Sequence, residues 1–131
     1  MSHSESRPQK IHALVVDDGE IEQKLMAHYL SRVSNYAVTC IAAMNCEKAI
    51  EVLKAEKIDV CFLDYYLDGE IGTDLVEALN ELNIEVPIVM ITGLDEQEFE
   101  RLVYPYGIEH TLSKEQLSSN ELDNTLLNVL A

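Results

Sequence analysis

The sequence is poor in basic residues, with 9 Lys and Arg against 24 Asp and Glu and a formal net charge of −15 at pH 7. A surface of this charge repels phosphate backbones and anionic membranes, so we expect neither direct DNA binding nor membrane binding. No apolar run approaches the length that spans a bilayer. The polar segment Met1–Lys10 also lacks the apolar middle of a secretory signal.

Cysteine is scarce as well. Cys40, Cys46 and Cys61 are an odd number and form no C-x-x-C pair, which argues against a disulfide framework and against a zinc site. Cys61 lies within the apolar run Val60–Leu63, where we expect a buried, inert thiol. Free thiols fit a reducing compartment, so we expect a cytoplasmic protein.

The chain has no linker rich in Pro, Gly or Ser and no repeat of fixed period. Its 131 residues, 47% of them hydrophobic, match one ordinary domain with one core. We therefore expect a flexible tail over residues 1–10 and a single domain over residues 11–131.

Short apolar runs alternate with longer helical patterns along the whole chain. Five β-α units in a row predict a mostly parallel sheet with helices on both faces and right-handed crossovers. The predicted strands are Ile11–Val16, Tyr36–Ala42, Ile58–Leu63, Val86–Ile91 and Ile108–Leu112. The helical patterns cover Ile21–Val33, Ala49–Leu53, Leu75–Leu82, Phe99–Val103 and Leu117–Leu130.

Polar residues follow four of the five predicted strands. In open α/β sheets, ligands bind outside the carboxyl ends of the strands, so these residues are expected to converge on one site. Each alone is an ordinary loop residue or helix cap. They are Asp17 and Asp18 after the first strand, Asp64 after the third, Thr92 after the fourth and Lys114 after the fifth.

Three neighbouring carboxylates repel one another and raise one another's pKa values. A divalent cation relieves this repulsion, and Mg²⁺ suits such a site because it prefers oxygen ligands and keeps waters that phosphate oxygens can replace. A carboxylate beside the metal can attack phosphorus, while the metal, a Lys ammonium and a Thr hydroxyl hold the phosphoryl oxygens. The pattern therefore predicts a site for a cation and a phosphoryl group.

In their order and spacing, these residues resemble the receiver domains of two-component response regulators, from about Ile11 to the C-terminus. The resemblance implies a doubly wound (βα)5 fold of the flavodoxin-like kind, with a five-stranded parallel sheet in the order 2-1-3-4-5. The matching motifs are Leu14–Asp18, Phe62–Leu67 with Gly69 and Gly72, Ile91–Gly93, and Leu112–Lys114.

The resemblance also implies a role for each site residue. Asp64 is expected to accept a phosphoryl group from a histidine kinase or a phosphotransfer protein, and Thr92 and Lys114 to contact that group. The protein is then a signalling phosphoacceptor and not an enzyme.

The metal ligands that the resemblance implies are four. Asp18 is expected to bind Mg²⁺, or Mn²⁺, directly, and Asp17 partly through water. Asp64 and the backbone carbonyl of Tyr66 complete the set.

The sequence departs from the family at the position of the aromatic residue that responds to phosphorylation. Thr111 stands three residues before Lys114, where many receivers carry the Tyr or Phe that turns inward on phosphorylation. The usual switch is therefore not expected. The resemblance implies that the side chains of Tyr66 and Leu94 flank the phosphoryl group. Neither carries an acid or amide to orient water, so we hypothesise slow self-dephosphorylation.

Other functions stay open at this stage. We expect a stand-alone receiver that passes its phosphoryl group on, or that binds a downstream protein at the surface formed by the last two helices and the last strand. A receiver fold used only as an interaction scaffold is the main alternative. An aspartyl phosphohydrolase would need an Asp where Tyr66 stands, and a flavodoxin-like cofactor binder would need a glycine- and hydroxyl-rich loop in place of Asp17-Asp18-Gly19-Glu20.

Overall fold

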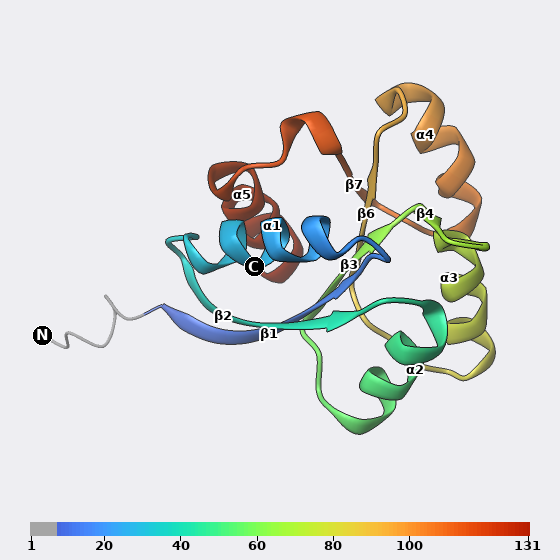
Figure 1. The fold of residues 1–131 in the computed structure, drawn as a ribbon, viewed down its shortest axis with the longest axis horizontal. Helices are drawn as coiled ribbons and strands as arrows, with labels where there is room; N and C mark the ends of the chain where they lie inside the picture. Colours follow the sequence, from blue (N-terminus) through green and yellow to red (C-terminus); the bar gives the residue numbers. More distant parts are fainter. Residues whose placement is uncertain (1–7) are drawn as a thin grey trace, which may run out of the picture.

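A computed structural model describes residues 8–131 of the chain, and the first seven residues of the expected tail lie outside this description. One sheet of five parallel strands forms the centre of the fold (Figure 1), in the order β2-β1-β3-β6-β7. Once the small hairpin β4-β5 is set aside, this is the order 2-1-3-4-5, so the predicted fold is confirmed. The strands are β1 (Gln9–Val16), β2 (Tyr36–Ala43), β3 (Val60–Asp64), β6 (Ile88–Thr92) and β7 (His110–Ser113).

Helices cover both faces of the sheet. Helices α1 and α5 pack together on one face, while α2 and α3 pack together on the other, beside α4 (Figure 1). The helices are α1 (Glu20–Ser31), α2 (Cys46–Ala55), α3 (Gly72–Glu81), α4 (Glu96–Val103) and α5 (Ser119–Leu130). Two short 3-10 turns, η2 (Tyr104–Tyr106) and η3 (Lys114–Gln116), follow α4 and β7.

The core consists of two apolar clusters, one on each face of the sheet. Alternate side chains of β1 enter opposite clusters: Ala13 and Val15 face α1 and α5, whereas Leu14 and Val16 face α2 and α3. Strand β3 is buried along its whole length. Burial on both faces explains why the central strands read as continuous apolar runs in the sequence.

Helix α1 was predicted correctly, but its apolar stripe only in part. Of the predicted residues, Tyr29 and Val33 are partly buried against the core, whereas Ile21 is 77% exposed. The buried residues of the helix are Gln23, Met26 and Leu30. The spacing of three and four residues is that of a helix face. The true stripe was hidden because it begins with a polar residue.

Strand boundaries differ from the prediction by one or two residues. Strand β1 begins at Gln9, inside the expected tail, because Gln9 and Lys10 pair in register with Tyr36 and Ala37 of β2. Strand β6 begins after Pro87, which has no N–H to give to the ladder.

A two-stranded antiparallel hairpin, β4 (Tyr66–Leu67) and β5 (Glu70–Ile71), follows β3. The sequence predicted only its turn, Asp68-Gly69. Gly69 has a φ of +75°, a left-handed conformation that favours glycine. The hairpin carries the chain from the carboxyl end of β3 into α3.

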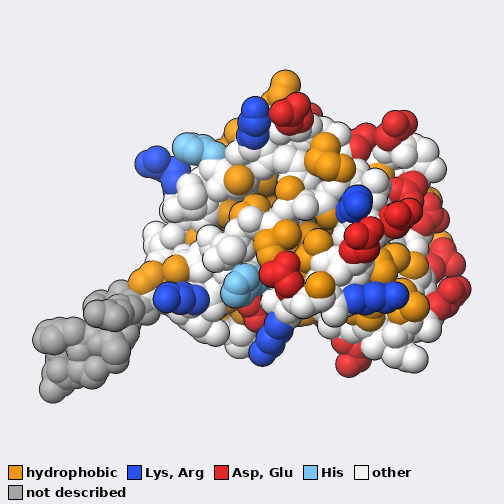
Figure 2. Space-filling view, turned by 60° about the horizontal axis from the view of Figure 1, so that its bottom comes forward, with side chains coloured by type: hydrophobic (Ala, Val, Ile, Leu, Met, Phe, Trp, Pro, Cys, Tyr) orange, Lys and Arg blue, Asp and Glu red, His pale blue; other side chains and the backbone are white. Residues whose placement is uncertain are grey.

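The surface carries the acidic excess unevenly. Figure 2 shows acidic side chains gathered along one edge of the molecule, whereas Lys and Arg side chains stand singly. Over the described part of the chain, no helix has both the length and the apolar character needed to cross a bilayer.

Candidate functional site

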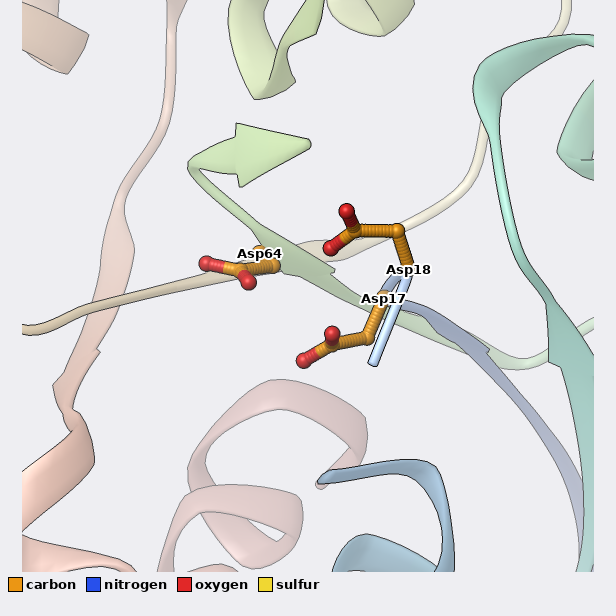
Figure 3. Close-up of side chains that lie close together, drawn as sticks. All are labelled: Asp17, Asp18 and Asp64. Carbon is orange, nitrogen blue, oxygen red and sulfur yellow. The ribbon is translucent and has the colours of Figure 1, made fainter. Parts of the chain in front are cut away.

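The three predicted acids meet at the carboxyl edge of the sheet. One carboxylate oxygen from each of Asp17, Asp18 and Asp64 lies within 4.8 Å of the other two. Figure 3 shows Asp17 and Asp18 leaving the end of β1 and Asp64 lying beside them at the end of β3. Asp17 and Asp64 are buried and Asp18 is exposed, so the cluster is open to solvent on one side.

Backbone N–H groups hold each carboxylate in place. The N–H of Gly19 donates to Asp17 Oδ1 at 2.8 Å, and the N–H of Asp68 donates to Asp18 Oδ2 at 3.1 Å. Asp64 Oδ1 accepts a longer hydrogen bond of 3.4 Å from the N–H of Tyr66. The hairpin turn that contains Asp68 therefore helps to position an acid fifty residues away in the sequence.

The cluster disfavours its own negative charge. The pKa of Asp17 is raised from 3.8 to about 6. Burial is the largest cause, and the charges of Asp64 and Glu22 also raise the pKa, whereas the hydrogen bond from Gly19 and the charge of Lys114 lower it. Burial likewise raises the pKa of Asp64, against the lowering effect of Lys114. A divalent cation would remove this repulsion, and an all-oxygen donor set fits Mg²⁺ or Mn²⁺.

Lys114 contacts Asp64 from the end of strand β7. Its Nζ lies 3.3 Å from Asp64 Oδ2. The Lys114 side chain is 41% exposed whereas that of Asp64 is 6% exposed, so the ammonium group covers the buried carboxylate at the edge of the site. Lys114 opens η3, directly after β7, which is where the sequence placed it.

Thr92 lies at the end of β6, the strand next to β3, one residue beyond the partner of Asp64 in the ladder. Its buried hydroxyl accepts a hydrogen bond of 3.1 Å from the N–H of Leu94. Within residues 8–131, no hydrogen bond joins this hydroxyl to Asp64. Tyr66 begins β4 with an exposed side chain. The structure thus gathers the three acids and Lys114 tightly, and places Thr92 and Tyr66 at neighbouring positions.

Gly72 is a site residue whose role the sequence did not reveal, although it belongs to the matching motif. It is the first residue of α3, and its N–H donates to the carbonyl of Tyr65 at 2.6 Å. A Cβ at this position would lie 2.9 Å from the carbonyl oxygen of Asp64 and 2.8 Å from Met90 Sδ. Only glycine lets α3 begin this close to the end of β3.

An aromatic pair connects the site to α4. Tyr65 directly follows Asp64, is buried, and packs edge-on against the fully buried Phe99 of α4, with ring centroids 5.1 Å apart and planes at 85°. Thr111, at the position of the missing switch aromatic, is half-buried in β7. The aromatic contact between the site and α4 therefore comes from the residue that follows β3 and not from β7.

A further residue that the sequence analysis did not single out is Gln23 of α1. Its side-chain amide is buried against the backbone at the ends of β1 and β2. The sequence does hint at its burial, because Gln23 lies three positions before Met26 and seven before Leu30, on the same face of the helix.

Comparison with known proteins agrees with this geometry. The sequence model of the response regulator receiver domain matches residues 13–126. Among curated relatives, the regulatory protein PhoP of Bacillus subtilis is 36% identical over 90 residues, which cover 69% of this chain and 36% of PhoP. The sensor kinase/phosphatase LuxN of Vibrio campbellii is 34% identical over 80 residues, or 61% of this chain and 9% of LuxN. The chain spans less than half the length of these relatives.

Solved structures show the same fold. The chemotaxis protein CheY4 of Vibrio cholerae superposes with a TM-score of 0.77 at 24% identity, over 95% of this chain and 100% of that one. The receiver domain of RstA from Klebsiella pneumoniae superposes with a TM-score of 0.78 at 25% identity, over 92% of this chain and 99% of that one. The chain belongs to the receiver domain family of two-component response regulators.

Proposed function

We propose that Asp64 accepts a phosphoryl group from a phosphohistidine, carried by a histidine kinase or a phosphotransfer protein. The observation that carries this proposal is the convergence of three carboxylate oxygens within 4.8 Å, with the Lys114 ammonium 3.3 Å from Asp64 Oδ2. Asp17, Asp18, Asp64 and the Tyr66 carbonyl would hold Mg²⁺ or Mn²⁺. The metal, when bound, supplies positive charge to the phosphoryl oxygens.

The protein's own groups then have distinct tasks. A carboxylate oxygen of Asp64 forms a bond to phosphorus as the P–N bond to the donor imidazole breaks, and the electron pair of that bond stays on the imidazole nitrogen. The product is an acyl phosphate on Asp64. Lys114 exchanges its ion pair with Asp64 for a phosphoryl oxygen, and the Thr92 hydroxyl, released from the N–H of Leu94, donates to another.

The output of the site is proposed to be phosphorylation-dependent protein binding or onward phosphotransfer, in the cytoplasm. The surface for a downstream partner is formed by α4, β7 and α5, where several large apolar side chains are exposed. The acidic excess favours a basic or amphipathic protein over DNA or a membrane. The exposed side chains are Leu102 of α4, Tyr104 and Tyr106 of the following turn η2, and Leu127 of α5.

A second candidate is an interaction scaffold with little phosphorylation-dependent switching. Thr111 favours this reading, because it puts a small side chain where the aromatic of the usual switch stands. Such a protein would bind its partner equally well with and without a phosphoryl group.

One experiment separates these functions. The protein is incubated with Mg²⁺ and acetyl phosphate, or with beryllium fluoride as a phosphoryl mimic, and intact mass or the fluoride adduct is measured for wild type and Asp64→Asn. A Mg²⁺-dependent adduct that Asp64→Asn abolishes supports the phosphoacceptor. No adduct supports the scaffold, and sustained release of phosphate from many small esters supports a phosphohydrolase.

A further inference from the structure

Gln23 is a buried amide that contacts three backbone carbonyls at the edge of the site. Its residue is 8% exposed, and its Nε2 lies 2.9 Å from the carbonyl oxygen of Val15, 3.0 Å from that of Asp17 and 3.1 Å from that of Ala43. These carbonyls belong to β1, to the loop after it and to β2. One side chain of α1 therefore ties together two strands and the first residue of the acidic pair.

The orientation of this amide is fixed by its surroundings. The opposite orientation would put Gln23 Oε1 against three carbonyl oxygens, which repel it. In the observed orientation Oε1 is buried and, among residues 8–131, is the one fully buried side-chain polar atom without a hydrogen-bond partner. A buried acceptor that loses water without gaining a partner is unfavourable, so the amide is retained at a cost to stability.

What the amide provides is a clamp on the backbone of Asp17. The N–H of Asp17 donates to the carbonyl of Ala43 at 3.1 Å, and its carbonyl accepts from Gln23 at 3.0 Å. Both peptide groups of Asp17 are thus held, and the second of them is also the peptide that begins Asp18. Without Gln23, the carbonyl of Asp17 loses this hydrogen bond, so the peptide between Asp17 and Asp18 is less constrained.

We propose that Gln23 is a positioning residue of the metal site, which fixes the Asp17-Asp18 peptide so that both carboxylates face one cation. This inference rests on the proposed Mg²⁺-dependent function. Residues that orient metal ligands without touching the metal typically change affinity by about 10–100-fold when they are replaced. We expect Gln23→Met, which keeps the length of the side chain and removes the amide, to weaken Mg²⁺ binding at least about tenfold.

The test measures Mg²⁺ affinity by calorimetry, and amide hydrogen exchange by NMR in the metal-free protein. In Gln23→Met we expect faster exchange at Asp17, whose N–H donates to the Ala43 carbonyl, and at Gly19, whose N–H donates to the Asp17 carboxylate, and little change in β6 and α3. Leu30→Met is the matched control, since Leu30 is buried in the same helix and contacts the core instead of the loop. If Gln23→Met does not fold, Gln23→Asn replaces it, because it keeps the amide but is one methylene too short to reach the carbonyls.

The outcomes are separable. Weaker Mg²⁺ binding and faster loop exchange in the Gln23 variant alone support the clamp. Wild-type affinity in a folded Gln23 variant overturns it, and so does an equal loss of affinity in Leu30→Met. If the wild-type protein itself does not bind Mg²⁺, the proposed function fails together with this inference.

Discussion

Replacing Asp17 by Asn should stabilise the metal-free protein at neutral pH. The pKa of Asp17 is about 6 in the folded protein against 3.8 ordinarily, chiefly because of burial. Ionised Asp17 therefore weakens the fold above pH 6, and this cost disappears as the pH falls through 6 toward 3.8. Asn has the same shape, carries no charge, and its amide oxygen can still accept the hydrogen bond from Gly19.

The size of the effect follows from the pKa. A rise from 3.8 to about 6 corresponds to about 3 kcal/mol between the two protonation states. In a domain of 131 residues this is about 10 °C in the melting temperature. We expect the free energy of unfolding of Asp17→Asn to exceed that of the wild type by up to this amount at pH 7.5. The difference should vanish well below pH 3.8, because Asp17 is then protonated in both the folded and the unfolded state.

The assay is thermal unfolding of wild type and Asp17→Asn across this pH range, with and without Mg²⁺. Mg²⁺ should raise the melting temperature of the wild type more than that of the variant, because the ion binds the folded state through the acid that the variant lacks. An Asp17→Asn protein that is less stable than wild type at pH 7.5 without metal would refute the argument that burial and repulsion strain this cluster.

Three further predictions concern residues around the acids. Gly72→Ala should lower the free energy of unfolding by about 1–3 kcal/mol, measured in urea, because its Cβ would be too close to the Asp64 carbonyl and to Met90 Sδ. Gly93→Ala is its control, since a Cβ there meets nothing within 4 Å, and equal stability of the two variants would contradict the packing argument. Leu94→Asn or Tyr66→Glu should speed loss of the phosphoryl group on the order of tenfold by orienting water, measured as decay of the phosphorylated mass, and unchanged rates would disprove the hypothesis of slow self-dephosphorylation. Phe99→Leu should lower the free energy of unfolding by about 1–2 kcal/mol and speed amide hydrogen exchange in α4, because the edge-on contact with Tyr65 is removed. Unchanged protection of α4 would contradict the link between α4 and the site.

The order of the elements could be predicted from the sequence because each central strand is buried on both faces. A run such as Val60–Leu63 can be identified as a strand from the sequence alone, since continuous apolar residues of this length fit a buried parallel strand. The five-stranded order came from the family resemblance and not from periodicity. The hairpin β4-β5 was not foreseen, because two-residue strands leave no pattern beyond their turn.

The acids of the site were found because they lie at the carboxyl ends of strands or directly after them, and these ends meet at one edge of a parallel sheet. Lys114 was found for the same reason. Gln23 and Gly72 act through contacts with backbone atoms of other segments, which the sequence does not specify. The helical spacing of Gln23 to Met26 and Leu30 indicates at most that it lies on the buried face of α1. The exposed Ile21 shows the same limit, since the apolar spacing of α1 included residues at its start that the fold leaves in solvent.

The central claim is that Asp64 becomes an acyl phosphate, and chemical trapping tests it most directly. The protein is incubated with Mg²⁺ and acetyl phosphate and then reduced with borohydride, which converts an aspartyl phosphate to homoserine, and the modified residue is located by peptide mass spectrometry. We predict homoserine at position 64, dependent on Mg²⁺ and at no other Asp or Glu. Unmodified Asp64 in a folded, Mg²⁺-bound protein, or modification spread over several acids, would contradict the proposed role of Asp64.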